Sequence, residues 1–276
     1  MLPSKRLLAY SQQMRELFEV VHECDDLLVI NKPAGLVCHP TKGDVYSSLI
    51  SRARIYLGEG SAPQMVNRLD RETSGIILLA KNGESALELR RIWETRAVRK
   101  SYLAVVHGHV AQNTGSIDAP LGKDEKSLIA IKDCVRPDGA ASETKFAVLK
   151  HFTRNEGNFS LFQVEPLTGR KHQIRIHLAH LGHPIVGDKL YGGDENIYLS
   201  FVQYQLTPAQ EQKLLLSNQA LHAEEVRFLW RGEARSFSAR PEPSFLAFAG
   251  LDNWPIEGRE IGSSASTTRT VIPPMR

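Results

Sequence analysis

The sequence has few cysteines and no long apolar run. Its three cysteines, Cys24, Cys38 and Cys134, lie far apart and form no C-x-x-C pair. An odd number without framework spacing indicates free thiols in a reducing compartment. No window approaches the roughly 18 consecutive apolar residues of a membrane-spanning helix, and the N-terminus lacks the apolar core and cleavage site of a secretory signal. The sequence therefore predicts a cytoplasmic protein with no membrane segment.

Net charge and nucleotide-binding loops are also scarce. The formal net charge is +3 and the pI about 8.7, which is compatible with a polyanionic partner but does not establish one. There is no internal repeat, no G-x-G-x-x-G and no phosphate-binding loop, so no nucleotide cofactor is predicted. The 276 residues are 42% hydrophobic, enough for one large core.

The order of apolar runs predicts an α+β protein with a mostly antiparallel sheet, because strands outnumber helices and often follow one another. We expect an N-terminal extension at 1–20, one domain at 21–257 and a disordered Ser/Thr/Pro-rich tail at 258–276. Strands are predicted at 26–33, 75–81, 100–110, 143–152 and 159–167, with strands and a loop closing the domain at 220–245. Helices are predicted at 45–57, 83–95, 169–181 (after Thr168 as N-cap) and 207–216.

The densest chemical signal is VNRLDRETSGIILLAK at 66–81. A polar loop that leads into a buried strand is a rigid support for a catalytic side chain. Arg68 and Arg71 flank Asp70 and favour the ionised carboxylate that a nucleophile requires. Taken alone, the same pattern also fits an aspartate that caps a turn and an arginine that only pairs with it.

Three further segments support the catalytic interpretation. Together with the R-L-D-x-x-T-S-G segment, they resemble the motifs of RluA-type pseudouridine synthases, in the same order and between about residues 25 and 195. The segments are INKPAGLVCHP at 30–40, RKSYLAVVHG at 99–108 and LTGRKHQIRIHLAHLGHPIVGDKLYG at 167–192. The resemblance implies the pseudouridine synthase fold, a central mixed sheet with flanking helices and an active-site cleft that holds Asp70. It implies isomerisation of uridines in RNA without a cofactor.

The resemblance assigns three catalytic residues. Asp70 matches the catalytic carboxylate, which attacks the sugar or stabilises positive charge there. Tyr102 matches the active-site tyrosine that stacks on uracil and takes part in proton removal. Arg175 matches the arginine that pairs with the aspartate, and Ile174 the apolar residue that packs on the base. By their own sequence, Tyr102 could be an ordinary strand aromatic and Arg175 a helix-face arginine.

The resemblance also implies RNA contacts around these residues. Arg68 would fill the stack or grip the backbone while the target uridine flips out. Asn67 stands where histidine is common in the family, and both side chains can donate a hydrogen bond to a neighbouring group. The other predicted substrate-binding residues are Lys32, Arg71, Thr73, Arg170, His172 and His177.

A histidine cluster invites a zinc interpretation, which we reject. His172, His177, His180 and His183 lie near Asp188, but no glutamate separates them as in H-E-x-x-H and no cysteine is close. On the predicted helix, His172 and His177 would also face different ways. We predict no metal, and interpret Gly187–Asp188 and Tyr191–Gly192 as structural turn residues.

The predicted partner is structured RNA, a stem-loop of ribosomal or transfer RNA, bound by a monomer. About 30 residues precede the N-K-P motif, too few for the ribosomal-protein-like N-terminal domain of many relatives. The catalytic domain would then grip RNA itself. Candidate phosphate contacts near the motifs are Lys32, His39, Lys42, Arg52, Arg54, Arg90, Arg91, Arg96, Arg99, Lys100, Arg170, Lys171 and Lys189.

Two other functions remain open from the sequence. A non-catalytic RNA-binding or ribosome-assembly factor on the same fold would not need Asp70, Tyr102 and Arg175 together. A carboxylate-based hydrolase of small glycosides normally uses two paired acids, and the motifs offer one convincing carboxylate.

Overall fold

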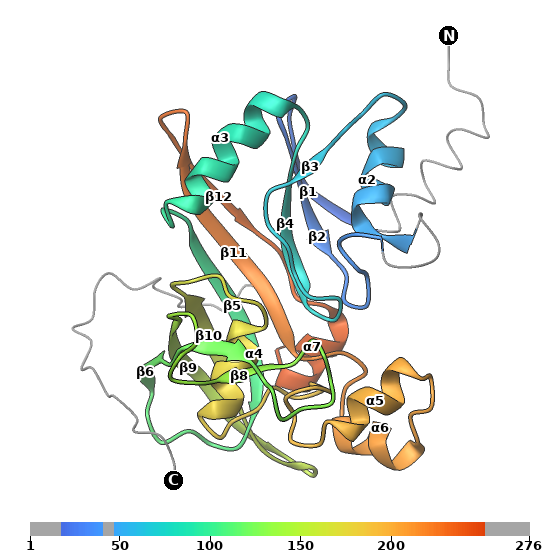
Figure 1. Cartoon of the computed structure of the whole chain (residues 1–276), viewed down its shortest axis with the longest axis vertical. Coiled ribbons are helices and arrows are strands. Elements are labelled where there is room, and N and C mark those ends of the chain that lie inside the picture. The colour runs from blue at the N-terminus through green and yellow to red at the C-terminus, as the bar shows by residue number, and fades with distance from the viewer. Residues whose placement is uncertain (1–17, 41–46, 252–276) are drawn as a thin grey trace. The chain divides into compact units, whose positions relative to one another are not determined.

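Residues 18–40 and 47–251 are described by the computed structural model (Figure 1). They fall into two units, each described here by itself. The first unit comprises the chain up to Lys100 together with His222–Glu242, and the second comprises Ser101–Leu221 and the chain from Pro243 onward. The polypeptide passes between the units three times, so neither unit is one continuous segment.

The first unit is built on a mixed sheet. Its strands run in the order β1-β2-β4-β11, with β12 paired to β11 and β3 paired to β4. Only β4 and β11 pair in parallel, and the other pairs are antiparallel. The strands are β1 (Glu19–Glu23), β2 (Leu27–Lys32), β3 (Gln64–Met65), β4 (Ser74–Ala80), β11 (Leu221–Trp230) and β12 (Glu233–Ser238).

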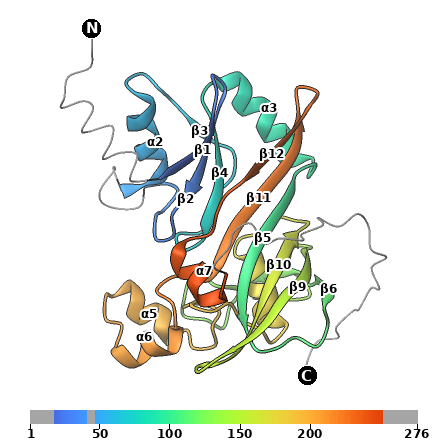
Figure 2. The same cartoon turned by 180° about the vertical axis from the view of Figure 1, so that it is seen from behind.

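Two capped helices cover opposite faces of this sheet, as Figures 1 and 2 show. Helix α2 (Leu49–Leu57) begins after Ser48 and packs on the face of Leu28 and Ile30. Helix α3 (Gly83–Glu94) begins after Asn82 and packs on the face of Leu27 and Val29. Because successive strand residues point to opposite faces, a strand covered on both sides must be apolar throughout. This explains the uninterrupted apolar runs in β2 and β4.

The second unit has an antiparallel sheet in the order β5-β10-β9-β6 and a separate β7-β8 pair. Figure 2 shows β9 and β10 as a long hairpin beside β5. The strands are β5 (Arg99–His107), β6 (Thr114–Asp118), β7 (Leu121–Lys123), β8 (Asp133–Val135), β9 (Glu143–Arg154) and β10 (Gly157–Pro166). The helices are α4 (Gln173–His180), α5 (Asn196–Val202), α6 (Pro208–Leu214) and α7 (Pro243–Ala249).

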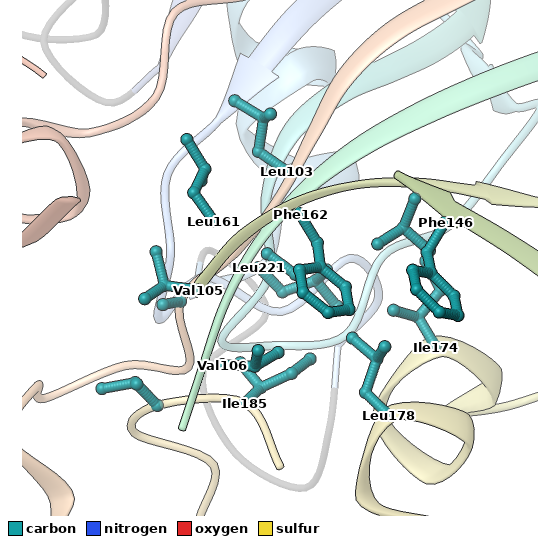
Figure 3. Close-up of a cluster of buried hydrophobic side chains, with 14 of the residues drawn as sticks. Leu103, Val105, Val106, Phe146, Leu161, Phe162, Ile174, Leu178, Ile185 and Leu221 are labelled. Carbon is teal, nitrogen blue, oxygen red and sulfur yellow. The ribbon is translucent and has the colours of Figure 1, made fainter. Parts of the chain in front are cut away.

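The core of the second unit fixes the position of α4. Figure 3 shows Ile174 and Leu178 of α4 directed at the aromatic rings of the sheet. These rings belong to Phe146 and Phe162, which stack with centroids 5.1 Å apart. A helix held by two buried side chains against stacked rings has little freedom to slide, so the residues between them are held in a fixed orientation.

Most of the predicted elements are confirmed, and the α+β class with a mostly antiparallel mixed sheet is correct. The predicted start of the 169–181 helix is wrong. Thr168 is no N-cap, because its hydroxyl donates to the Gln173 side chain (2.7 Å) and α4 begins only at Gln173. The predicted 45–57 helix begins at Leu49, and residues 45 and 46 lie outside the described residues. Helices α5 and α7 were not predicted, α7 lying where a strand and loop were expected.

Other expectations stay predictions. Residues 1–17 of the extension, the 258–276 tail and the candidate phosphate contact Lys42 lie outside the described residues. The single 21–257 domain and the active-site cleft also remain predictions. The longest helix in the described part of the chain is α3 with 12 residues, and none there meets the length and hydropathy of a membrane span.

The parallel contact between β4 and β11 depends on two residues that follow the Asp70 loop. Gly75 has φ +114° and lies opposite Ala223. A Cβ on Gly75 would lie 2.6 Å from Ala223 N and still closer to Ala223 O. Beside it, Ser74 Oγ lies 2.9 Å from His222 Nδ1, and His222 Nε2 lies 3.0 Å from Ala239 O. The carbonyl only accepts, so Nε2–H donates to Ala239 and the Ser74 hydroxyl donates to Nδ1.

We expect Gly75→Ala to destabilise the first unit by on the order of 3 kcal/mol, because the methyl group must push two strands apart and the backbone leaves its positive φ. Denaturant unfolding measures the loss. Gly83→Ala is the matched control, since a Cβ there meets nothing within 4 Å at the start of α3. Equal stability of the two variants would contradict the close approach of β4 and β11.

We also expect stability to fall below pH 6.5. Burial lowers the pKa of His222 to about 4, a shift that the bond to Ala239 O only partly offsets. An unfolded histidine titrates near pH 6.5, so between these values the unfolded chain binds a proton that the folded chain does not. At about 1.4 kcal/mol per pH unit, the loss by pH 4 is about 3 kcal/mol.

Urea unfolding between pH 7 and pH 4 measures this dependence. His222→Asn keeps a donor and an acceptor but does not titrate, so its stability should fall less steeply than that of the wild type. His180→Gln, which changes an exposed histidine, should keep the wild-type slope. Parallel curves for the wild type and His222→Asn would contradict the assignment.

Candidate functional site

The loop that carries Asp70 is held through its backbone. Three consecutive carbonyls accept hydrogen bonds from inside the first unit. The Cys38 thiol donates to Leu69 O (3.2 Å), and Thr73 N donates to Asp70 O (3.2 Å). Arg71 O accepts from Gly35 N (2.8 Å) and from the Lys32 ammonium (3.1 Å). Because the main chain is fixed on both sides of Asp70, the half-buried Asp70 side chain extends from a fixed backbone position.

The N-K-P-x-G turn is the support for this loop. Lys32 is 0% exposed, and its ammonium also donates to Pro33 O (2.8 Å) and Leu36 O (3.0 Å). Burial lowers the pKa of Lys32 to about 8, although Cys38, Glu242 and Asp70 oppose the shift. Three carbonyls therefore satisfy all three N–H groups of the ammonium. The structure gives Lys32 a role in holding the loop, and its contact with RNA stays a prediction.

Around Asp70, the predicted binding residues have different environments. The Asn67 amide donates to Ile76 O (3.1 Å) and accepts from Leu78 N (2.8 Å), so it pairs with β4 much as a strand residue would. Thr73 is buried, whereas Arg68 and Arg71 are exposed. Arg71 Nε also donates to Gly35 O (3.2 Å). Of these four side chains, the arginines present charge to the solvent.

In the second unit, the G-R-K-H turn before α4 is fastened by a residue that the sequence analysis did not identify. Gln173 donates through Nε2 to Glu143 O and Thr144 Oγ1 (both 2.9 Å) and accepts from Arg170 N (3.0 Å). The turn is thereby tied to β9. Arg170 itself is exposed, and its Nε donates to Ala141 O (3.3 Å).

Two predicted binding residues on α4 point into the protein. Ile174 is buried in the core of Figure 3. His177 is 0% exposed, with Nε2 2.9 Å from Ala119 O and Nδ1 2.8 Å from Thr144 Oγ1. Burial lowers the pKa of His177, so its neutral form is favoured. These partners fasten α4 to its surroundings, and contact of either side chain with RNA stays a prediction.

Arg175 is paired with Asp188, which the sequence analysis took for a turn residue. Arg175 Nε lies 2.7 Å from Asp188 Oδ2 and Nη2 lies 2.8 Å from Oδ1, and both side chains are almost fully buried. Tyr102 stands in β5 opposite Val164 and packs partly buried against the core. His172 precedes α4 with φ 55°, and its Nδ1 lies 2.9 Å from the Tyr191 hydroxyl.

The predicted residues thus gather in two places, one in each unit. The loop and its support in the first unit hold Lys32, Asn67, Arg68, Asp70, Arg71 and Thr73. The α4 region and β5 in the second unit hold Tyr102, Arg170, His172, Ile174, Arg175 and His177. Among the residues that the structure describes, no group of three or more His, Cys, Asp or Glu side chains is placed to hold a metal ion. All three cysteines are free thiols, as predicted.

Comparison with known proteins covers the residues gathered in both units. The model of the RNA pseudouridylate synthase family matches residues 26–180, a range that includes Asp70, Tyr102 and Arg175. An uncharacterized RNA pseudouridine synthase of Chloroflexus aurantiacus is 41% identical over 167 residues, covering 59% of this chain and 51% of that protein. The dual-specificity RNA pseudouridine synthase RluA of Vibrio parahaemolyticus is 35% identical, covering 80% of this chain and 82% of that protein.

Other relatives extend the comparison. The ribosomal large subunit pseudouridine synthase C of Vibrio cholerae is 36% identical, covering 71% of this chain and 63% of that protein. The chain thus spans about half to two thirds of the length of several curated relatives that it matches. Among solved structures, human RNA pseudouridylate synthase domain containing 1 aligns with a TM-score of 0.67 at 26% identity, covering 91% of this chain and 89% of that one.

Proposed function

The chain belongs to the RNA pseudouridylate synthase family, and from that premise we propose that it isomerises uridine to pseudouridine in RNA with Asp70 as the catalytic carboxylate. The observation that carries the proposal is the anchoring of the Asp70 loop. Hydrogen bonds to the carbonyls of Leu69, Asp70 and Arg71 fix the backbone on both sides of the carboxylate. A catalytic group that must reach one particular atom of a sugar or base needs such a fixed backbone position.

The reaction exchanges one bond for another within a single nucleotide. The bond between C1′ and N1 of uridine breaks, the base turns while bound, and a bond between C1′ and C5 forms. The proton on C5 leaves, and N1 gains a proton, so no cofactor is required. In our proposal, Asp70 attacks the nucleotide or stabilises the positive charge that develops on the sugar. Tyr102 stacks on the base and takes part in removal of the C5 proton.

Arg175, Ile174 and Arg68 complete the proposed assignment. Arg175 keeps the Asp70 carboxylate ionised and oriented, and Ile174 packs on the base. The target uridine must first leave its stack, at a cost of about a few kcal/mol. Arg68, which is exposed beside Asp70, fills the vacated stack or grips the backbone. The remaining proposed contacts are Lys32, Asn67, Arg71, Thr73, Arg170, His172 and His177.

We propose a structured stem-loop of ribosomal or transfer RNA as the substrate. Two relatives are named for the large ribosomal subunit and for dual specificity, which supports this class. We further propose a monomer that acts in the cytoplasm, in keeping with the three free thiols.

We predict that Asp70→Asn abolishes the reaction. The substitution keeps the size of the side chain and removes its charge, so release of tritium from C5-tritiated uridine in total RNA should slow by on the order of 10³-fold or more. Asp25→Asn, an exposed aspartate in the same unit, is the matched control and should release tritium at the wild-type rate. Mapping the new pseudouridine then identifies the RNA.

The same assay discriminates the rival function. A non-catalytic RNA-binding or assembly factor predicts no release from the wild type although RNA still binds. Release by both the wild type and Asp70→Asn would establish the activity and remove Asp70 from it. Each result leads to a different assignment.

We predict that Arg68→Ala slows single-turnover modification of the mapped RNA about 10- to 100-fold, because the cost of unstacking is no longer offset. The defect should shrink on a short RNA in which the target uridine is unpaired. Arg227→Ala is the control, since that guanidinium lies in the same unit and pairs with Glu225 (2.8 Å). If Arg68→Ala bound and modified RNA as well as the wild type, the flipping role would be wrong.

A further inference from the structure

Asp188 lies at the centre of a buried hydrogen-bond network that the proposed chemistry does not include. Its two oxygens accept from Arg175 Nε (2.7 Å) and Nη2 (2.8 Å), and Oδ1 also accepts from Leu190 N (2.9 Å) and Tyr191 N (3.0 Å). Burial alone would raise the pKa of Asp188, but the Arg175 charge and these four N–H donors outweigh it and hold the pKa below its ordinary value. The carboxylate is therefore a fixed anion.

The two bonds from Arg175 determine the direction of its guanidinium. An arginine side chain has about 2 kcal/mol of rotamer entropy, and a two-point contact with a carboxylate removes most of that freedom. Asp188 uses the Nε–Nη2 edge, so the edge that carries Nη1 is directed away from this pair. The Tyr191 ring lies against the same guanidinium, with Arg175 Cζ 5.0 Å from the ring centroid. Arg175 is thus held both at one edge and on one face.

The Tyr191 hydroxyl extends the network to His172. Burial raises the pKa of Tyr191 well above its ordinary value, so the hydroxyl keeps its proton. It accepts from Asp133 N (3.2 Å) and lies 2.9 Å from His172 Nδ1. The contact with Nδ1 is a hydrogen bond that ties the His172 imidazole to the tyrosine hydroxyl.

His172 is also held in an uncommon backbone conformation. Its φ of 55° and ψ of 15° lie in the left-handed region, which costs a residue with a Cβ about 1 kcal/mol or more. The hydrogen bond to Tyr191 ties the imidazole to the network that holds Arg175. One short segment, Asp188–Tyr191, thereby orients two of the residues assigned to the reaction.

We propose that Asp188 and Tyr191 are positioning residues for pseudouridine formation, Asp188 by aiming the Arg175 guanidinium and Tyr191 by holding the His172 imidazole through its Nδ1. This inference rests on the proposed function. It replaces the interpretation of both residues as parts of a structural turn. Neither residue needs to touch the RNA, because each acts through the side chain that it holds.

The first test is Asp188→Asn in the full chain, with the tritium-release assay and RNA binding measured separately. We expect the single-turnover rate to fall at least tenfold while the Kd for RNA changes less than threefold. Glu195→Gln is the matched control. It breaks the pair with Lys132 (2.7 Å) in the same unit without touching Arg175, and should leave the rate unchanged.

A double-mutant cycle separates positioning from a general structural effect. If Asp188 acts through Arg175, Asp188→Asn should add little to the defect of Arg175→Lys, so the double variant should be no more than about threefold slower than the slower single variant. Multiplied defects would overturn the inference, and so would an Asp188→Asn rate within threefold of the wild type.

Tyr191→Phe covers the case in which Asp188→Asn fails to fold. It keeps the ring against Arg175 and removes only the hydroxyl, so folding should persist. We expect a slower rate and a shifted pH profile, because the His172 imidazole loses its hydrogen bond at Nδ1. An unchanged rate and profile would overturn the role of Tyr191. If Asp188→Asn does not fold, the Arg175 Nε–H resonance of the wild type tests whether Asp188 holds the guanidinium.

The ¹⁵N–¹H resonance of Arg175 Nε, assigned by its loss in Arg175→Lys, reports the pair without catalysis. Slow exchange of the Nε proton with water in the wild type would support the buried Arg175–Asp188 pair. Exchange as fast as that of an exposed arginine would overturn it. A wild type that releases no tritium overturns the proposed function and the catalytic part of this inference with it. An active wild type with an unaffected folded Asp188→Asn overturns the inference alone.

Discussion

The arrangement of the first unit depends on hydrogen bonds to the backbone carbonyls at positions 69, 70 and 71. The donors are the Cys38 thiol to Leu69 O, the Thr73 amide to Asp70 O, and both the Lys32 ammonium and the Gly35 amide to Arg71 O. Two of these four donors come from the N-K-P-x-G turn, and Cys38 follows that turn three residues later. A buried ammonium is costly unless every N–H is satisfied, so Lys32 ties the turn to the Asp70 loop. Displacing the loop would leave the ammonium short of an acceptor.

The far end of the loop is fixed by a steric constraint. Gly75 allows β4 to approach the backbone of Ala223, and the Ser74–His222 bond closes the contact from the side chains. The T-S-G part of the motif therefore forms the contact between β4 and β11. The R-L-D part lies in the preceding loop and carries the Arg68 and Asp70 side chains. The motif therefore divides into a half that carries the proposed catalytic carboxylate and a half that holds the loop in place.

The sequence predicted the elements best where an apolar run is long and covered on both faces. Strands β2 and β4 are examples, since burial on both sides leaves one consistent pattern. It failed for α7, because Phe245, Leu246 and Phe248 are closely spaced in a helix of only seven residues, which is too short for a period to emerge. It also failed for the start of α4. Thr168 is a residue type that favours N-caps, but its hydroxyl is engaged by Gln173.

The site shows the same division. The motifs identified the residues to which we assign the reaction, and the structure gives each a definite environment. The residues that hold the surrounding backbone or a site side chain, Cys38, His222 and Asp188, were not identified as such. Each is a single polar residue whose partner lies elsewhere in the chain, and nothing in the sequence pattern marks such a pair. The resemblance singled out Arg175, but only the three-dimensional structure shows that one edge of its guanidinium is bonded to Asp188.

The Arg175–Asp188 pair is hard to explain by stability alone. Taking two charges out of water costs several kcal/mol per ion, and a well-packed apolar pair of similar volume is often as stable. Asp188 also accepts hydrogen bonds from two backbone amides. These bonds fix the carboxylate more firmly than is needed to neutralise the charge of Arg175. A surplus of directed bonds specifies orientation. A directed guanidinium is what the positioning role proposed for Asp188 requires, and that role would account for a buried pair that stability alone does not demand.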